Sequence, residues 1–188
     1  MPRFVTRWRV RTGYPLAILY WWLARPTYES ILAGAIIAIL GLLIRASAAG
    51  HLRKSEALTT TGPYAWTRNP LYLGSSLMAA GFAVAGNSWW SALVLIAYFC
   101  VFYPAVMRNE EAELQRRYGA AFLEYAKRVP LFFPLPPRHA PAHSAATHTT
   151  AHFSWPQYRR NREYQAALGV LGALFLVWLR LKLRTRGY

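Results

Sequence analysis

Apolar runs separated by short polar segments dominate the first 106 residues and predict membrane-spanning helices. Four runs follow one another, at residues 14–24, 31–49, 71–86 and 93–106. The first is short for a crossing, so we expect its helix to extend back into the arginine-rich N-terminal arm. The pattern predicts an all-α fold: an integral-membrane helical bundle of four to five spans.

A last apolar run, residues 166–179, has arginine or lysine on both flanks. Its roughly 14 residues would rise about 21 Å as a helix, less than the roughly 30 Å of a hydrocarbon core. Basic flanks on both sides also oppose a crossing under the positive-inside rule. We therefore expect residues 156–188 to form an interfacial helix, with a fifth span as the alternative.

The segment 58–74, LTTTGPYAWTRNPLYLG, interrupts the apolar pattern with hydroxyls, aromatic rings, two prolines and one arginine. Gly62 and Pro63 predict a turn, because glycine tolerates positive φ and proline fixes its own φ. Asn69 and Pro70 form a second break, and Pro70 suits the first turn of the next helix. The segment therefore predicts a structured loop.

A second polar segment begins at Met107 and reads MRNEEAELQRRYGAAFLEYAKRVP. Apolar and aromatic residues recur in it at helical spacing, which predicts an amphipathic helix that leaves the membrane and ends at Pro130. The recurring residues are Leu114, Tyr118, Ala121 and Tyr125.

Residues 134–155 are rich in proline, alanine, threonine and histidine and predict a linker between a membrane domain, residues 1–133, and the C-terminal helix. Two H-x-x-x-H pairs in it have a spacing that could bind a metal. We interpret them as solvated linker residues, without a metal site, because no carboxylate or thiol accompanies them. These histidines are His139, His143, His148 and His152.

The chain carries a formal net charge of +15 and is 55% hydrophobic. We interpret the charge as membrane topology and not as nucleic-acid binding. Arg45 lies near the end of the second run, and we expect its guanidinium to reach the lipid headgroups. The alternative is that Arg45 faces the bundle and pairs with an anionic ligand. Cys100 is the single cysteine, so no intramolecular disulfide can form.

The basic segments orient the predicted bundle. The N-terminal arm, residues 51–70 and the region after Met107 are basic, whereas the turns at residues 25–30 and 86–91 are not. Four crossings place the three basic segments together on the cytoplasmic side. The two polar segments then face each other at one membrane surface.

The facing segments bring carboxylates and aromatic rings to one place. Adjacent Glu110 and Glu111 are costly where a span leaves the membrane, unless they are solvated or bound. They either complement the dipole of a solvated helix start or bind a cation or a ribose diol. Tyr64 and Trp66 would attract a positive ligand through cation–π interactions. The sequence contains neither a Rossmann nor a P-loop glycine motif.

Two blocks of the sequence together resemble the isoprenylcysteine carboxyl methyltransferases and the related phospholipid methyltransferases. The first block is G-x-Y-x-x-x-R-N-P-x-Y-x-G, and the second runs from the Glu110–Glu111 pair to Val129–Pro130. They occur in the family's order, and the resemblance covers residues 51–130. It implies an integral-membrane, S-adenosylmethionine-dependent methyltransferase without a Rossmann fold, in which both blocks and the amphipathic helix close a cofactor pocket facing the cytoplasm.

The resemblance also implies roles for individual residues. Asn69 stands where the family commonly has histidine, and Val106 where the carboxyl methyltransferases have arginine. Arg108 is therefore the catalytic candidate that would orient an anionic substrate head group. The implied cofactor-binding residues are Glu56, Ala57, Leu58, Thr59, Tyr64, Arg68, Asn69, Pro70, Leu71, Tyr72, Glu110 and Glu111.

We thus expect methyl transfer to a lipidic or prenylated substrate in the bilayer, with carboxyl O-methylation most like the family. N-methylation of a phospholipid or another small molecule is an alternative. A non-catalytic lipid-binding scaffold and a lipid reductase that uses a nicotinamide remain further alternatives. The sequence selects neither the acceptor nor the oligomeric state.

Overall fold

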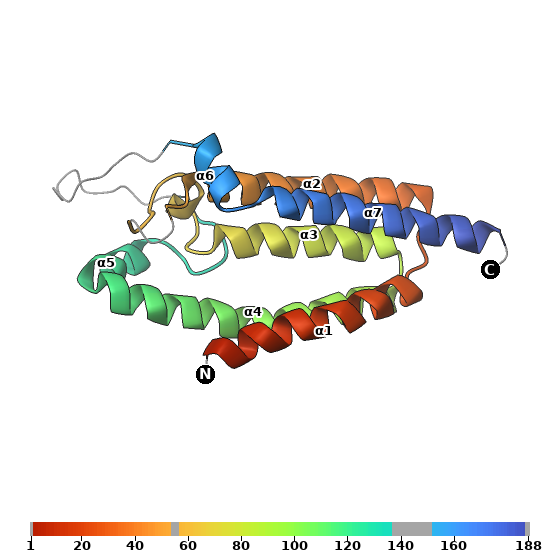
Figure 1. Cartoon of the computed structure of the whole chain (residues 1–188), viewed down its shortest axis with the longest axis horizontal. Helices are drawn as coiled ribbons and strands as arrows, with labels where there is room; N and C mark the ends of the chain where they lie inside the picture. The colour runs from red at the N-terminus through yellow and green to blue at the C-terminus, as the bar shows by residue number, and fades with distance from the viewer. Residues whose placement is uncertain (1, 54–56, 137–151, 187–188) are drawn as a thin grey trace.

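The computed structural model describes residues 2–53, 57–136 and 152–186, with the backbone alone for residues 2–10. Its described part is helical and contains no β-strand, which confirms the predicted all-α class. Five long helices lie along one direction, and the shorter ones gather at one end (Figure 1). The elements are α1 Pro2–Leu23, α2 Tyr28–His51, the 3-10 helix η1 Gly62–Ala65, α3 Pro70–Gly86, α4 Trp89–Tyr118, α5 Ala120–Arg128, α6 Trp155–Arg160 and α7 Tyr164–Thr185.

Helices α2 and α3 form the closest packed pair, and glycines at their interface make this possible. A Cβ on Gly34 would lie 2.3 Å from the carbonyl oxygen of Gly81, and a Cβ on Gly41 would lie 2.5 Å from that of Gly74. The two backbones therefore touch directly, as small residues allow in helical membrane proteins. This contact fixes the first turn of α3 relative to α2.

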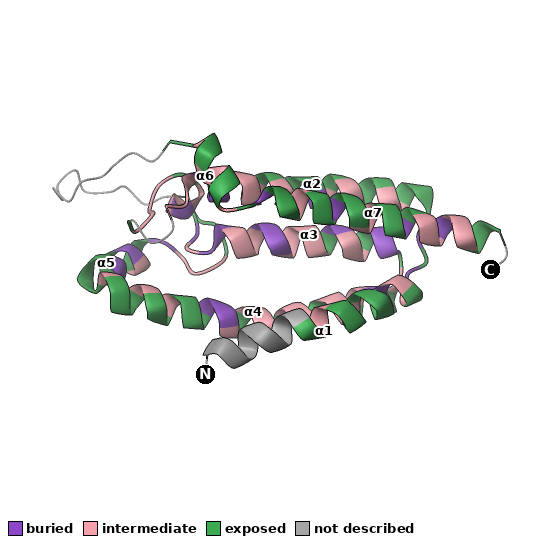
Figure 2. Ribbon diagram, viewed as in Figure 1, coloured by how far each residue is buried: buried purple, intermediate pink, exposed green. Residues whose placement is uncertain are grey.

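The C-terminal helix is longer than the apolar run predicts. Helix α7 has 22 residues because the flanking polar and basic residues are helical too, and 22 residues rise roughly 33 Å. It lies alongside α2, with Val177 and Leu181 buried (Figures 1 and 2). The length of about 14 residues, on which the expectation of an interfacial helix rested, is therefore too small; α7 is long enough to cross a bilayer, and the interfacial helix and the fifth span both stay predictions.

Among the described residues, three helices, α2, α4 and α7, are long and apolar enough to span a membrane, and α3 is a shorter apolar helix of 17 residues. Many residues along these helices are exposed (Figure 2), and they include many large apolar side chains. On α7, Leu168, Leu171 and Phe175 are each more than half exposed. Apolar faces of this extent suit a lipid environment.

The second polar segment does not begin a new helix at Met107. Helix α4 continues unbroken through Met107 to Tyr118. Gly119 then adopts a positive φ of 52° and redirects the chain into α5. The single amphipathic helix predicted up to Pro130 is therefore two helices, because only glycine takes this backbone conformation readily. Phe122, Tyr125 and Val129 of the second part form a small core.

Candidate active site

The loop between α2 and α3 has the two breaks that its sequence predicts. Gly62 has φ +61°, and a Cβ there would lie 2.5 Å from the ring of His51. Pro63 follows in η1, and Pro70 opens α3. Both predicted breaks are confirmed, and between them the chain carries Tyr64, Trp66 and Arg68 at one end of the bundle.

Tyr64 is held inside the loop by its partner Tyr125. The Tyr125 hydroxyl donates a hydrogen bond to the carbonyl oxygen of Tyr64 at 2.7 Å, and both side chains are buried. Burial is the main cause that raises the pKa of each phenol well above its ordinary value. Both therefore stay neutral at physiological pH, and Tyr64 offers a ring without charge.

The loop is tied to the chain that follows α5. The backbone N–H of Arg68 donates to the carbonyl oxygen of Pro130 at 2.9 Å. The backbone N–H of Leu135 donates to the carbonyl oxygen of Trp66 at 3.1 Å. The side-chain amide of Asn69 donates to the carbonyl oxygen of Leu131 at 3.0 Å. Asn69 is buried and uses its amide to join the two polar segments. This arrangement gives the position a structural task that requires no titratable group.

The two acidic residues have separate partners on the loop side. The Tyr72 hydroxyl donates to Glu110 Oε1 at 2.6 Å, and Arg68 Nη1 forms an ion pair with Glu111. Both acids lie well inside α4, so the alternative of a solvated helix start is wrong. The hydrogen bond and the ion pair join the two predicted blocks in space, and they leave one face of Glu110 exposed.

Aromatic rings continue from this junction along α4. The rings of Tyr72 and Tyr103 meet edge to face with centroids 5.2 Å apart, and Phe99 stacks on Tyr103 at 4.0 Å. Tyr98 and Phe102 form a further pair at 4.9 Å. The carboxylates therefore sit beside an aromatic wall that runs toward the apolar part of the bundle.

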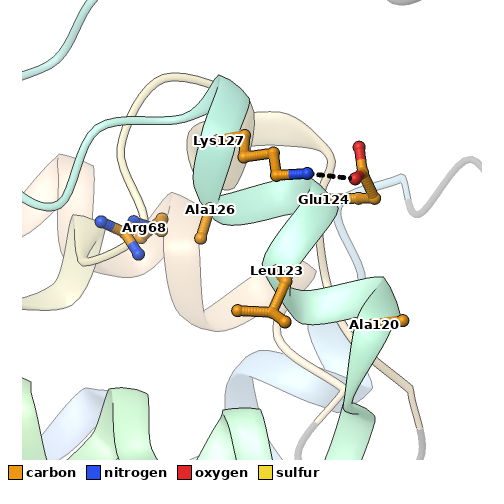
Figure 3. Close-up of a pocket in the computed structure, with 6 residues that line it drawn as sticks. All are labelled: Arg68, Ala120, Leu123, Glu124, Ala126 and Lys127. Carbon is orange, nitrogen blue, oxygen red and sulfur yellow. Dashed lines mark hydrogen bonds and ion pairs between the residues drawn. The ribbon is translucent and has the colours of Figure 1, made fainter.

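An open pocket of about 440 Å³ lies between Arg68 and α5 (Figure 3). Ala120, Leu123 and Ala126 supply its apolar lining. Lys127 and Glu124 at its edge bond to each other at 2.7 Å. Of the predicted site residues that the structure describes, only Arg68 lines it, and the Nε atom of Arg68 is buried without a hydrogen-bond partner. The pocket thus combines an apolar lining from α5 with the side chain of Arg68.

The remaining residues of the predicted site differ in burial and in their contacts. Leu58 packs against the core around Phe122, and the Thr59 hydroxyl accepts a bond from the backbone N–H of Arg53 at 3.3 Å. Ala57 and Arg108 are exposed, and Pro70 is fully buried. Four residues of the sequence predictions, Glu56, His139, His143 and His148, lie outside the described residues.

Arg45 does not extend to the headgroups as predicted. Its Nε forms an ion pair with Glu163, and its Nη1 donates to the hydroxyl of Ser75 and, at 3.3 Å, to the carbonyl oxygen of Leu71. It faces the bundle, where a protein carboxylate takes the place proposed for an anionic ligand. Glu163 lies more than a hundred residues away in the sequence, so no local pattern predicts this pair.

Comparison with known proteins gives one family match and several relatives. Residues 8–121 match the phospholipid methyltransferase family. The cobalt-zinc-cadmium resistance protein CzcN of Cupriavidus metallidurans is 32% identical over 148 residues, which are 71% of this chain and 67% of that protein. The nickel-cobalt-cadmium resistance protein NccN of Alcaligenes xylosoxydans xylosoxydans is 42% identical over 82 residues, 44% of this chain and 38% of its own length.

A protein-S-isoprenylcysteine O-methyltransferase from Schizosaccharomyces pombe is 32% identical over 89 residues, 47% of this chain and 38% of its own length. The chain thus spans less than half the length of two of these three relatives. No solved structure matches significantly.

The fold and the site define a helical membrane protein with a polar, aromatic-lined site at one end of its bundle. The family match covers more than half of the chain, so this protein belongs to the phospholipid methyltransferase family. It is by that membership a methyltransferase, and the resemblance predicted from its two sequence blocks is confirmed.

Proposed function

We propose that the protein transfers a methyl group from S-adenosylmethionine to a lipidic or prenylated acceptor at the membrane surface. The observation that carries the proposal is the junction of the two polar segments, made by the Tyr72–Glu110 hydrogen bond and the Arg68–Glu111 ion pair. Relatives named as isoprenylcysteine O-methyltransferases support it. The N-terminal arm, residues 51–70 and the region after Met107 are basic and support an active site that faces the cytoplasm.

The residues present fit this methyl donor. The ribose of this donor carries two hydroxyls, which can donate hydrogen bonds to a carboxylate such as Glu110. Its sulfonium is attracted to aromatic faces such as those of Tyr72 and Tyr103. The donor's own carboxylate needs a hydrogen-bond donor. Arg68 Nε and Thr61 Oγ1 are buried polar atoms without a hydrogen-bond partner in the described part of the chain. When bound, S-adenosylmethionine would supply an electrophilic methyl group.

The chain's own contribution is alignment and exclusion of water. Methyl transfer is an in-line displacement in which the bond from carbon to sulfur breaks as the bond from carbon to the acceptor forms, so no protein nucleophile is needed. A carboxylate acceptor has no proton to lose, whereas an amine sheds one afterwards. Exposed Arg108, one turn before Glu111 on α4, is the proposed partner for an anionic head group. The aromatic wall would receive the apolar tail.

The experiment is turnover with isotopically labelled S-adenosylmethionine and a lipid extract, with the purified protein in nanodiscs and mass spectrometry of the products. We expect a labelled lipid from the wild type and a loss of about tenfold or more in kcat/KM for Glu110→Gln, which weakens a charge-assisted hydrogen bond. The matched control is Glu113→Gln, an exposed carboxylate one turn further along α4.

The products separate the alternatives. A methyl ester identifies a carboxylate acceptor, and a methylated amine identifies the N-methyltransferase alternative. A folded wild type that labels nothing would favour the lipid-binding scaffold, and a copurified nicotinamide would favour the reductase. Equal rates in Glu110→Gln and the wild type would contradict the proposed site.

A further inference from the structure

Residues 152–163 cap the site end of α2, although they lie beyond the region matched by the family. The backbone N–H of Ser154 donates to the carbonyl oxygen of Gly50 at 3.0 Å. The side-chain amides of Asn161 and Gln157 donate to the carbonyl oxygens of Ala49 and Leu52, at 2.8 and 2.7 Å. The last carbonyls of a helix lack partners within it. This segment supplies them from across the chain.

The first connection between this segment and the site is an ion pair. Glu163 is 7% exposed and pairs with Arg45 of α2. Arg45 also donates to the hydroxyl of Ser75 and the carbonyl oxygen of Leu71, in the first two turns of α3. Leu71 directly precedes Tyr72, the residue that bonds to Glu110. The Arg45–Glu163 ion pair is thus connected to the junction of the two polar segments through the first turn of α3.

The second connection between this segment and the site is a series of contacts made by aromatic rings. Phe153 packs on Gly50, where a Cβ would lie 2.2 Å from its ring, and it meets His51 edge to face at 6.2 Å. The His51 ring in turn lies against Gly62, at the turn that presents Tyr64. Burial is the main influence on the pKa of Tyr64, but Glu163 also raises it and Arg45 lowers it. Both charges therefore act at the Tyr64 phenol.

We propose that residues 152–163 are a working part of the active site, and that Arg45 and Glu163 are positioning residues for it. Together they hold the first turn of α3 and the Tyr64 turn in the arrangement that binds S-adenosylmethionine. The inference rests on the proposed function for its ligand. It adds a C-terminal element that the two sequence blocks do not contain.

The far end of α7 provides a matched control. There Lys182 Nζ donates to the Tyr28 hydroxyl at 2.8 Å, so α7 is also attached to α2 by a polar contact at the end away from the site. Glu163→Gln and Lys182→Gln each remove one charge that joins the same two helices. Only the first acts on the site. Glu163→Asp keeps the carboxylate and serves as the conservative variant.

The test measures two quantities in full-length protein in nanodiscs. The first is the dissociation constant for S-adenosylmethionine by calorimetry, and the second is amide hydrogen exchange of residues 58–73 without ligand. We expect Glu163→Gln to weaken binding about tenfold and to speed exchange of residues 58–73, and Glu163→Asp to recover most of both losses. Lys182→Gln should leave both within about twofold of the wild type.

Equal effects of Glu163→Gln and Lys182→Gln would overturn the proposal, because α7 would then matter only as a packed helix. Unchanged exchange in Glu163→Gln would overturn it as well. If the wild type binds no S-adenosylmethionine, the proposed function fails. The exchange of residues 58–73 in ligand-free protein then decides the positioning role by itself.

Discussion

The two ends of the bundle are built differently. At the far end, residues 24–27 join α1 to α2 and residues 87–88 join α3 to α4. Local geometry closes these turns: Thr27 and Ser30 form a capping box, and Asn87 adopts a left-handed φ of 44°. At the site end, much longer segments join α2 to α3 and α5 to α6, and residues more than sixty positions apart hold them.

This difference shows where function can be placed in such a fold. Short turns satisfy some of their own backbone groups, and the two far-end turns are also joined to each other, by the bond from the Arg25 N–H to the Gly86 carbonyl oxygen at 2.7 Å. Long loops must find partners elsewhere for every buried N–H and C=O. The site end therefore gains a specific arrangement of Tyr64, Arg68 and Tyr72, and it depends on distant residues to keep it.

The largest expected effect separates two positions with left-handed φ, one at each end of the bundle. Gly62→Val places a branched side chain at φ +61° and against the His51 ring, which should cost about 3 kcal/mol or more. S-adenosylmethionine affinity should fall by about a hundredfold. At the far end, Asn87→Gly suits the same region of φ and should change stability by less than about 1 kcal/mol. Calorimetry and thermal unfolding measure both.

Circular dichroism confirms that both variants keep their helices before binding is compared. Wild-type affinity in Gly62→Val would contradict the idea that the Tyr64 turn is built for the site.

A smaller effect compares one hydrogen bond at each end. Tyr125→Phe removes the donor to the buried carbonyl of Tyr64 and should cost about 1–3 kcal/mol, most of it as weaker ligand binding. Thr27→Ala removes the side-chain cap of α2 and should cost about 1 kcal/mol of stability without changing affinity. Dissociation constants and unfolding midpoints distinguish the two. The comparison fails if Thr27→Ala weakens binding as much as Tyr125→Phe.

The smallest effect concerns pH. The pKa values of Tyr64 and Tyr125 are raised by burial, so the folded protein keeps both phenols protonated while the unfolded chain loses these protons near pH 10. Their contribution to stability is complete below about pH 10 and declines as pH rises toward the folded-state pKa. Between about pH 8 and 11, the midpoint of thermal unfolding should fall less steeply with rising pH in Tyr125→Phe than in the wild type. Identical slopes would show that Tyr125 ionises normally.

The sequence predicts much of this fold because its signals are local. Hydrophobic runs identify α2, α3 and α4, and Gly62 and Pro70 mark the breaks of the loop. The juxtaposition of the two polar segments follows from counting spans and basic residues. The helices and breaks depend on residues close together in the chain, and the juxtaposition depends on the number of spans between the two segments.

The parts that could not be predicted depend on distant partners. Arg45 has the sequence context of an interfacial arginine, and only the folded chain brings Glu163 to it. The apolar run alone underestimates the length of α7, because the basic residues after it are helical too. There Arg180 Nη2 donates to the Trp22 carbonyl at 2.9 Å, with its guanidinium over the Trp21 ring. Gly119 offered a local signal for the break after α4, but the periodicity on either side obscured it.

The central claim is that the two polar segments form one binding pocket for S-adenosylmethionine. Amide hydrogen exchange of the wild-type protein in nanodiscs, with and without saturating S-adenosylmethionine, tests it most directly. The account predicts joint protection of residues 58–73 and of α4 around Glu110, and no change at the far-end turns around Thr27 and Asn87. Protection of only one segment, or of the far end, would contradict it.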